Sequence, residues 1–192
     1  MRTMGKIIVT EFISLDGVVD SPGGEYGYKH SGWAFEVDRG DAGNQFKVDE
    51  TMGSAAMLLG RVTYEGFAEA WPERDGEFAD KFNSMPKYVV SSTLTDPAWT
   101  NTHVLDGSDL AGAVARVKDA VDGDVVVHGS ATLVQGLIEA GLVDELRLMV
   151  YPMILGSGRK LWGETTDKHV LALKSTQTVG DGVTIQIYER AA

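Results

Sequence analysis

Short apolar runs alternate with helix-like segments along the first two thirds of the chain. The runs at residues 6–13, 55–59, 87–92 and 124–128 are bounded by turn-forming residues and predict buried strands, with a weaker strand at 102–105. The segments between them predict helices at residues 44–53, 64–71, 108–121 and 131–141. This alternation is typical of an α/β fold with a mainly parallel sheet.

Capping and breaking residues mark two of these helices. Apolar side chains fall on one helix face from Tyr64 to Trp71, and Pro72 is placed to end that helix. Ser108 is a good N-cap for the helix that follows the weak strand, and Gly123 stands just past its last turn.

The last third of the chain consists mainly of strands. Residues 145–151 alternate in polarity, and residues 170–179 and 183–190 flank Gly180-Asp-Gly182 as a hairpin. We therefore expect antiparallel strands to complete the sheet. The length of 192 residues fits one domain over residues 1–192.

The turn residues 14–17 end the first strand, and a polar, glycine-rich stretch follows them to about residue 43. It carries the aromatic residues Tyr26, Tyr28, Trp33 and Phe35. Two interpretations are open: a mobile loop that covers a ligand, or a surface loop whose aromatic side chains pack into the protein.

Composition narrows the possible functions. The formal net charge of −11 argues against a nucleic-acid partner, because such proteins present a basic face to phosphates. The absence of cysteine excludes disulfides, thiolate zinc sites and a cysteine nucleophile, and it fits a reducing cytoplasm. The apolar run at residues 7–9 is too short for a signal peptide or a membrane span, so we expect a cytoplasmic protein without membrane contact.

The most informative segment, residues 125–141, is a buried strand that runs through a glycine turn into a helix. Ser130 is predicted to cap this helix after the turn at Gly129. The amides of Ala131, Thr132 and Leu133 would then face an anion such as a pyrophosphate. Many structural helices begin in the same way, so the pattern alone leaves both interpretations open.

A second strand-to-helix junction repeats this arrangement. Arg61 stands at the start of the predicted helix, where its guanidinium would be well suited to a phosphate. The alternative is an arginine side chain that only contacts solvent. Two serines end the third strand, where open α/β sheets commonly bind ligands, and an arginine beside such hydroxyls favours the 2′-phosphate of NADPH. The residues of this second region are Gly60, Arg61, Val62, Thr63, Ser91 and Ser92.

Three further residues are candidates for contact with a small-molecule substrate. Asp16 follows the first strand, where a carboxylate would orient a polar substrate or relay a proton, while turn-forming aspartates are also common. Gly156 and Ser157 belong to a glycine-rich loop that lacks the spacing of a P-loop, and we interpret it as a loop near substrate. The histidines and carboxylates show no metal-ligand spacing, so no metal is expected.

Four blocks of the sequence, taken in order, resemble the dihydrofolate reductase superfamily, and in particular the branch similar to the reductase domain of riboflavin biosynthesis. Each block is weak alone, but the ordered set is specific and spans most of the chain. The blocks are Ser14-Leu-Asp-Gly17, Leu59-Gly-Arg-Val-Thr-Tyr-Glu65, His128-Gly-Ser-Ala-Thr-Leu133 continuing into Gly141-Leu-Val-Asp-Glu-Leu146, and Pro152-Met-Ile-Leu-Gly-Ser-Gly158 with Leu161 and Trp162.

The resemblance implies an NADPH-dependent reductase with a central sheet of about eight strands, acting as a homodimer. Carried over by motif, residues 60–63 would hold cofactor phosphates, residues 91–92 would approach the adenosine phosphate, and residues 129–133 would hold the pyrophosphate. Asp16 would lie near the substrate and the nicotinamide. The nearest family precedent for the reaction is the reduction of 5-amino-6-(5-phosphoribosylamino)uracil.

The chain departs from the family pattern at two places. It has His128-Gly129 where the family often has two glycines, which dihydrofolate reductases join by a cis peptide. The buried carboxylate of dihydrofolate reductases has no single counterpart, and the candidates are Glu36, Asp38, Asp41, Asp49 and Glu50. The main hypothesis is hydride transfer to a small polar heterocyclic or sugar-derived substrate. A dihydrofolate or pterin reductase and a non-catalytic nucleotide-binding module are the alternatives.

Overall fold

An eight-stranded sheet forms the centre of the protein, seen in a computed structural model that describes residues 5–24 and 27–191. The strand order is β4-β3-β2-β5-β1-β6-β8-β7. The first six strands in this order, β4-β3-β2-β5-β1-β6, are parallel to one another. Strand β8 is antiparallel to both of its neighbours, β6 and β7. The strands are β1 Ile7–Ser14, β2 Ala56–Gly60, β3 Lys87–Val90, β4 Thr102–Leu105, β5 Val125–His128, β6 Glu145–Tyr151, β7 Leu171–Val179 and β8 Val183–Arg190. The predicted α/β class, the mainly parallel sheet and its antiparallel C-terminal strands are confirmed.

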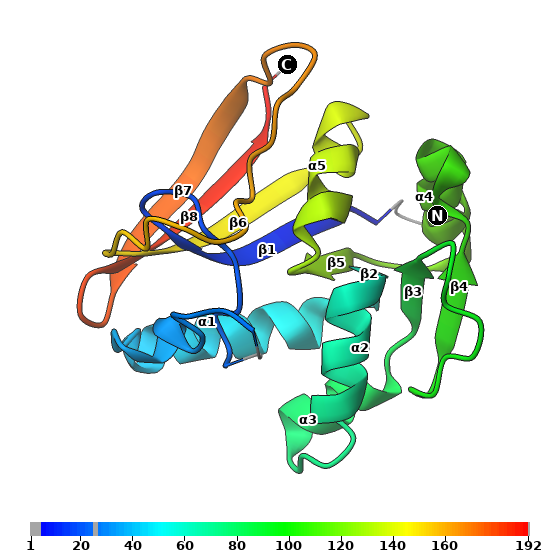
Figure 1. Ribbon diagram of the computed structural model, residues 1–192, viewed down its shortest axis with the longest axis horizontal. Helices are drawn as coiled ribbons and strands as arrows, with labels where there is room; N and C mark the ends of the chain where they lie inside the picture. The colour runs from blue at the N-terminus through cyan, green and yellow to red at the C-terminus, as the bar shows by residue number, and fades with distance from the viewer. Residues whose placement is uncertain (1–4, 25–26, 192) are drawn as a thin grey trace.

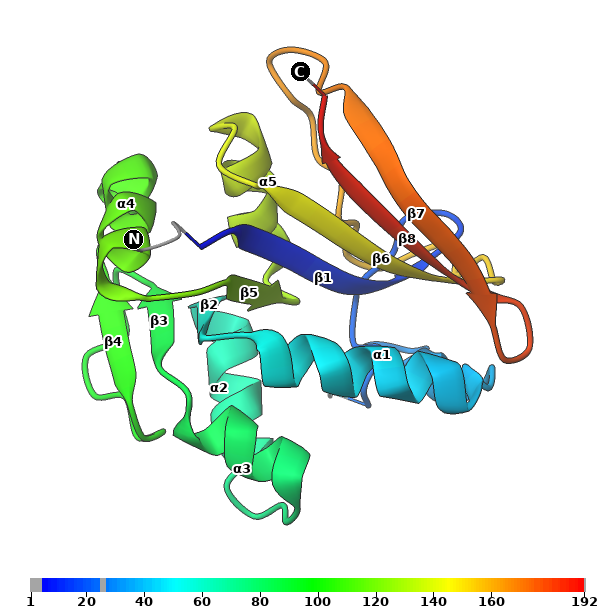
Figure 2. The ribbon, with the colours of Figure 1, turned by 180° about the vertical axis from the view of Figure 1, so that it is seen from behind.

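Helices cover both faces of the sheet (Figure 1). Helices α1, α2 and α3 lie on one face and α4 and α5 on the other, as the view from behind also shows (Figure 2). The helices are α1 Gly40–Gly53, α2 Arg61–Ala70, α3 Glu77–Ser84, α4 Leu110–Ala120 and α5 Ala131–Glu139, with short 3-10 helices η1 Trp33–Phe35 and η2 Gly107–Asp109.

The alternation of side chains along the strands builds a core on each face. In β2, Leu58 packs in the cluster that contains α4 and α5 residues, whereas Met57 and Leu59 pack with Tyr64 of α2 and Phe82 of α3. Successive side chains of a strand point to opposite faces, so a strand covered on both sides is apolar throughout. This explains why the central strands appear in the sequence as continuous apolar runs.

Helices α1 and α3 differ most from the sequence prediction, and α2 begins at Arg61 rather than residue 64. Helix α1 begins at Gly40 rather than residue 44, because its first turns contain Gly40 and Gly43 and carry no apolar pattern. Helix α3 was not predicted: it is short, and its exposed positions are the polar residues Glu77, Asp80 and Ser84, although Ala79 and Phe82 are buried. Single-sequence patterns are weakest for such short elements.

The prediction that Ser108 caps α4 is wrong. Ser108 lies inside η2, where its N–H donates to the carboxylate of Asp106 at 2.9 Å. The N-cap of α4 is Asp109, whose carboxylate accepts the N–H of Gly112 at 2.9 Å. An aspartate carboxylate one residue later serves the same first-turn donors that a serine hydroxyl would serve.

The glycine-rich stretch between β1 and α1 packs partly into the protein. Trp33 is fully buried, and its indole N–H donates to the carbonyl of Asp20 at 2.7 Å. Phe35 is exposed, and Tyr26 lies outside the described residues. The stretch therefore fits the surface-loop interpretation at Trp33 and not at Phe35.

Candidate functional site

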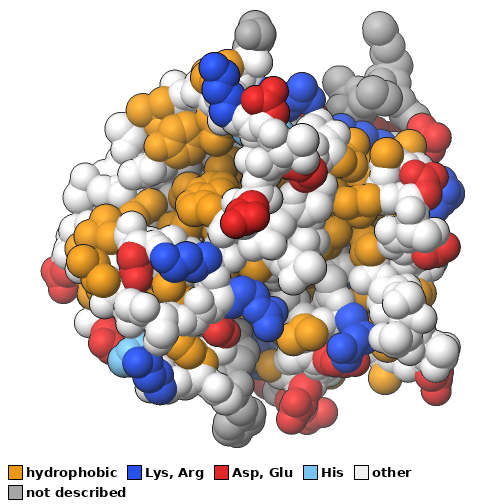
Figure 3. All heavy atoms as spheres, turned by 45° about the horizontal axis from the view of Figure 1, so that its top comes forward, with side chains coloured by type: hydrophobic (Ala, Val, Ile, Leu, Met, Phe, Trp, Pro, Cys, Tyr) orange, Lys and Arg blue, Asp and Glu red, His pale blue; other side chains and the backbone are white. Residues whose placement is uncertain are grey.

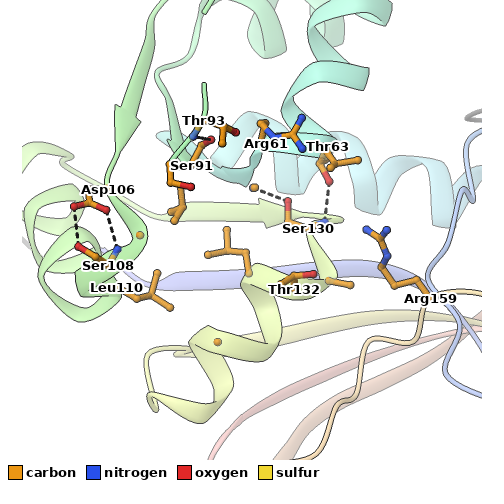
Figure 4. Close-up of a pocket in the computed structure, with 18 residues that line it drawn as sticks. Arg61, Thr63, Ser91, Thr93, Asp106, Ser108, Leu110, Ser130, Thr132 and Arg159 are labelled. Atoms are coloured by element: carbon orange, nitrogen blue, oxygen red, sulfur yellow. Dashed lines mark hydrogen bonds between the residues drawn. The ribbon is translucent and has the colours of Figure 1, made fainter. Parts of the chain in front are cut away.

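A cavity of about 730 Å³ opens at the carboxyl ends of the parallel strands β2 to β5 (Figure 4). The starts of α2 and α5 both face it, so the two strand-to-helix junctions that the sequence singled out lie at one site. Its wall consists of residues Gly60, Arg61, Val62, Thr63, Val90, Ser91, Ser92, Thr93, Asp106, Gly107, Ser108, Leu110, Ser130, Ala131, Thr132, Leu133, Gly136 and Arg159. All predicted cofactor residues except Gly129 are in this wall.

The two helix starts present free backbone donors to the cavity. In α5 the first bond to the preceding turn runs from Val134 N–H to the carbonyl of Ser130 at 2.9 Å. The N–H groups of residues 131–133 therefore have no partner within the helix, and neither helix has a side-chain cap. Such donors, together with the peptide dipoles of the helix, favour an anion.

Ser130 and Thr63 fix the two helix starts to each other. The N–H of Ser130 donates to Thr63 Oγ1 at 2.9 Å, and the N–H of Gly60 donates to Ser130 Oγ at 2.9 Å. The Ser130 hydroxyl in turn donates to the carbonyl of His128 at 3.1 Å. The prediction that the Ser130 hydroxyl caps α5 is therefore wrong, because that hydroxyl is used to hold α2 against α5.

Gly129 stands at the contact between the two helix starts. Its φ is +53° and that of Ser130 is +59°, and all peptide bonds among the described residues are trans. A Cβ added at Gly129 would lie 3.0 Å from Thr63 Oγ1 and 3.2 Å from Thr63 Cγ2. Both the left-handed backbone conformation and the close contact with Thr63 favour glycine at this position.

Arg61 has a carboxylate partner within its own helix. Its guanidinium donates to both oxygens of Glu65 at 2.9 and 2.8 Å, and both side chains are nearly half exposed. Such an exposed pair at positions i and i+4 contributes only about 0.3–0.5 kcal/mol to stability. A phosphate in the cavity would therefore compete easily for this guanidinium.

The opposite part of the wall combines hydroxyls with apolar side chains. Ser91 Oγ accepts the N–H groups of Thr93 and Leu94, so this hydroxyl also shapes the turn after β3. Asp106, Gly107 and Ser108 complete this wall. They were not predicted as site residues, because they follow the weak edge strand β4 and Ser108 was interpreted only as a helix cap. Apolar surface comes from Val90, Leu110 and Leu133.

Asp16 is bound to the loop after β6 and does not line the cavity. Its carboxylate accepts the Ser14 hydroxyl at 2.7 Å and the N–H groups of Leu155 and Gly156 at 3.1 and 2.8 Å. The Ser14 hydroxyl and these N–H groups lower the pKa of Asp16 to about 2. An ionised carboxylate of this kind does not suit a proton donor at neutral pH.

Gly156 and Ser157 lie in the same loop as the contacts of Asp16. The carbonyl of Ser157 accepts the hydroxyl of Tyr28 at 2.6 Å, which ties this loop to the stretch after β1. Neither residue lines the cavity, whereas Arg159 from the same loop does. The sequence placed this loop near the substrate but did not single out Arg159 as a site residue.

A buried polar network lies between β1 and α1. Of the five candidate carboxylates, Glu50 is buried, whereas Glu36, Asp38, Asp41 and Asp49 are exposed. Glu50 accepts the Thr10 hydroxyl at 3.0 Å and pairs with Lys47 and Arg147. Burial alone would raise the pKa of Glu50, but the charge and hydrogen bond of Lys47, together with the charge of Arg147, lower it overall.

Glu11 and His128 carry buried polar atoms without partners among the described residues. These atoms are Glu11 Oε1 and His128 Nε2. Burial raises the pKa of Glu11 well above its usual range, although Lys47 and a hydrogen bond from the Gly129 backbone act in the opposite direction. Burial also lowers the pKa of His128 to about 3, so its imidazole is neutral at physiological pH. Both groups adjoin the turn that precedes α5.

Two further features of residues 5–24 and 27–191 bear on function. These residues contain no grouping of three or more histidine, aspartate or glutamate side chains placed to hold a metal ion. None of the helices in this part of the chain is both long and apolar enough to cross a membrane.

Comparison with known families decides the family membership of the chain. The model of the RibD C-terminal domain matches residues 5–185. The chain belongs to the RibD C-terminal domain family. Similar proteins of Bacillus subtilis (strain 168) are the uncharacterized proteins YyaP, 25% identical with 95% of this chain and 94% of YyaP covered, and YwjB, 28% identical with 97% and 98% covered.

Solved structures share the fold over the whole chain. A candidate riboflavin biosynthesis protein of Shewanella sp. PV-4 has a TM-score of 0.79 at 21% identity, with 97% of this chain and 99% of that chain covered. Dihydrofolate reductase of Enterococcus faecalis complexed with NADP(H) has a TM-score of 0.57 at 16% identity, with both chains fully covered at 100%. The bifunctional deaminase and 5-amino-6-(5-phosphoribosylamino)uracil reductase of Thermotoga maritima has a TM-score of 0.64 at 13% identity; 98% of this chain and 57% of that longer chain are covered. This chain therefore has the same fold as these solved structures, which include a dihydrofolate reductase.

Proposed function

We propose that this protein is an NADPH-dependent reductase that acts in the cytoplasm on a small polar heterocyclic or sugar-derived substrate. The observation that carries the proposal is the position of two uncapped helix starts, α2 and α5, on one cavity of about 730 Å³. Membership of the RibD C-terminal domain family supports a reductase. The nearest precedent for the reaction is the reduction of 5-amino-6-(5-phosphoribosylamino)uracil.

The wall of the cavity has parts that suit the phosphates and the adenosine of NADPH. The free amides of residues 61–63 and 131–133 suit its phosphates. Arg61 with the hydroxyls of Ser91 and Ser92 suits the adenosine 2′-phosphate. The apolar surface of Val90, Leu110 and Leu133 suits the adenine ring.

The protein residues bind and orient the reactants, and a nicotinamide cofactor supplies the hydride when bound. The Ser130–Thr63 and Gly60–Ser130 hydrogen bonds hold the two helix starts in one geometry before the cofactor binds, which reduces the ordering cost of binding. Asp16 holds the loop at residues 155–156 beside β1 and orients this side of the substrate region. Because its carboxylate is ionised, the proton for the reduced product comes from another group or from water.

A substrate assay tests the proposal against its two alternatives. Purified protein is incubated with NADPH and either 5-amino-6-(5-phosphoribosylamino)uracil or dihydrofolate, and NADPH oxidation is followed by absorbance. We expect turnover with a ribosylaminopyrimidine-type substrate and none with dihydrofolate. Turnover with dihydrofolate alone would establish the pterin reductase, and tight NADPH binding without oxidation by any substrate would establish the nucleotide-binding module.

We further propose that the protein is a homodimer formed through the edge of the sheet at β7. Residues 171–178 of β7 are exposed on both faces, which is unusual for a strand of a packed sheet. Apolar side chains that include Leu171, Leu173, Val170 and Trp162 are exposed in this part of the molecule. Figure 3 shows hydrophobic side chains gathered on the left of that view, the side on which β7 lies in Figure 1. Sedimentation should give a dimer for the native protein and a monomer for Leu173→Lys.

A further inference from the structure

Arg159 has a backbone that is fixed by contacts with the loop after β1. Its N–H donates to the carboxylate of Asp20 at 3.1 Å, and its carbonyl accepts the N–H of Val19 at 2.9 Å. The preceding residue, Gly158, has φ +114°, and a Cβ there would lie 2.8 Å from Val18 and 2.9 Å from the ring of Tyr28. These contacts set the position from which the Arg159 side chain extends.

The side chain of Arg159 reaches the cavity from the side of the loop that follows β6. It lines the same cavity as Ser130 and Thr132, and Figure 4 shows it extending toward the Thr63–Ser130 pair. Its guanidinium makes no hydrogen bond or ion pair within residues 5–24 and 27–191. A guanidinium carried by a fixed backbone at a cavity wall is available to bind an anion.

The cavity wall contains two arginines, Arg61 and Arg159, which differ in their ion pairing. Arg61 is paired with Glu65, whereas Arg159 has no carboxylate partner in the described part of the chain. The acid in the wall, Asp106, already accepts the N–H and the hydroxyl of Ser108. Although the protein has a formal net charge of −11, the guanidinium of Arg159 therefore gives the α5 side of this cavity a positive charge that is available to an anionic ligand.

We propose that Arg159 binds the diphosphate of the nicotinamide cofactor, opposite the first-turn amides of α5. This inference rests on the proposed function. Arg61 and Ser91 belong to the part of the wall formed by α2 and the turn after β3, which suits the 2′-phosphate, whereas Arg159 faces the start of α5. The diphosphate is common to NADPH and NADH, so Arg159 contributes to the affinity for both cofactors and does not discriminate between them.

Calorimetric titration with NADPH and with NADH tests this assignment in the native protein, Arg159→Ala, Arg159→Lys and Lys160→Ala. Lys160 is the matched control, because it is an exposed cation on the same loop but does not line the cavity. We expect Arg159→Ala to weaken both cofactors by about tenfold or more with an unchanged ratio of their affinities. Arg159→Lys should recover part of the loss, and Lys160→Ala should change either affinity by no more than about twofold.

Each other result overturns the assignment in a different way. Unchanged binding by Arg159→Ala removes Arg159 from the cofactor site while leaving the proposed function intact. A loss confined to NADPH moves Arg159 to the 2′-phosphate. Unchanged cofactor binding with a raised KM for a phosphorylated substrate assigns Arg159 to the phosphate of that substrate. Absence of binding by the native protein overturns the proposed function as well. Thermal unfolding of each variant, which should match that of the native protein because the side chain is exposed, separates binding from folding.

Discussion

The backbone N–H of Ser130 donates to the hydroxyl oxygen of Thr63 at 2.9 Å, and this bond joins the start of α5 to the start of α2. A second bond, from the N–H of Gly60 to Ser130 Oγ, also joins the two helix starts. The hydroxyls of Thr63 and Ser130 therefore hold the helices together, and the backbone amides of the first turn of α5 stay free. The proposed nucleotide site is therefore built before any ligand binds. Its affinity should depend on hydrogen bonds that do not themselves contact the ligand.

Thr63→Val removes the acceptor of this bond with little change in shape. The partly buried N–H of Ser130 then lacks a partner, which should reduce the free energy of unfolding by about 1–3 kcal/mol and weaken NADPH binding. Thr132→Val is the matched control, because Thr132 lines the same cavity with an exposed hydroxyl. Its stability should stay within about 0.5 kcal/mol of the native value. Equal stability of both variants in urea denaturation would show that the bond contributes nothing.

Arg61→Ala should weaken NADPH binding while NADH binding changes little. The loss for NADPH should be about 1.5–3 kcal/mol, the usual contribution of a hydrogen bond to a charged group. Glu65→Gln frees the guanidinium from its exposed ion pair and should leave NADPH affinity equal or higher. Calorimetry with both cofactors measures these changes. A similar loss for NADH would contradict the contact with the 2′-phosphate.

Asp16→Asn should reduce stability at neutral pH and remove part of the acid sensitivity of the protein. The pKa of Asp16 is lowered from 3.8 in a model peptide to about 2, so its contribution to stability is present above about pH 4 and is lost as the pH falls through about 2. Urea denaturation between these pH values measures the effect. If the native protein and Asp16→Asn lost stability in parallel over this window, the carboxylate would not hold the loop at residues 155–156 in the way described.

Glu11→Gln should stabilise the protein, and more so at higher pH. The pKa of Glu11 is raised in the folded state above the value of 4.5 that it has in a model peptide. The contribution of Glu11 to the free energy of unfolding is therefore complete below pH 4.5 and is lost as the pH rises through the raised pKa. Glutamine keeps an acceptor for the Gly129 N–H but carries no buried charge. The difference in unfolding free energy between the two proteins should grow as the pH rises from 5 toward 9, by at most about 1.4 kcal/mol per pH unit. Glu36→Gln, which alters an exposed carboxylate, is the control. A constant difference across this range would contradict the raised pKa.

The sequence predicted the elements that have strong local signals. The apolar runs of β1, β2 and β5 predicted buried strands, and their glycine turns predicted the two helix starts that share the cavity. Parallel strands bring such turns to the same edge of a sheet, so local motifs were enough to predict that these residues lie together.

Features that depend on contacts between distant segments had no local signal. The hydroxyl of Ser130 follows a strand and precedes a helix, which predicts a cap, but its partner Gly60 lies seventy positions away in the chain. The wall contributed by Arg159 depends on a loop held by Asp16, Asp20 and Val19. Glu50 could not be selected among five acids because only the packing of α1 on β1 buries it.

Titration of isotope-labelled protein with NADPH, followed by the backbone amide resonances, tests most directly whether both helix starts bind one ligand. We predict that the amide resonances of residues 61–63 and of residues 131–133 shift in parallel during the titration. Both sets should give the same dissociation constant and a stoichiometry of one NADPH per chain. Shifts confined to one of the two helix starts, or no shifts at either, would contradict the account.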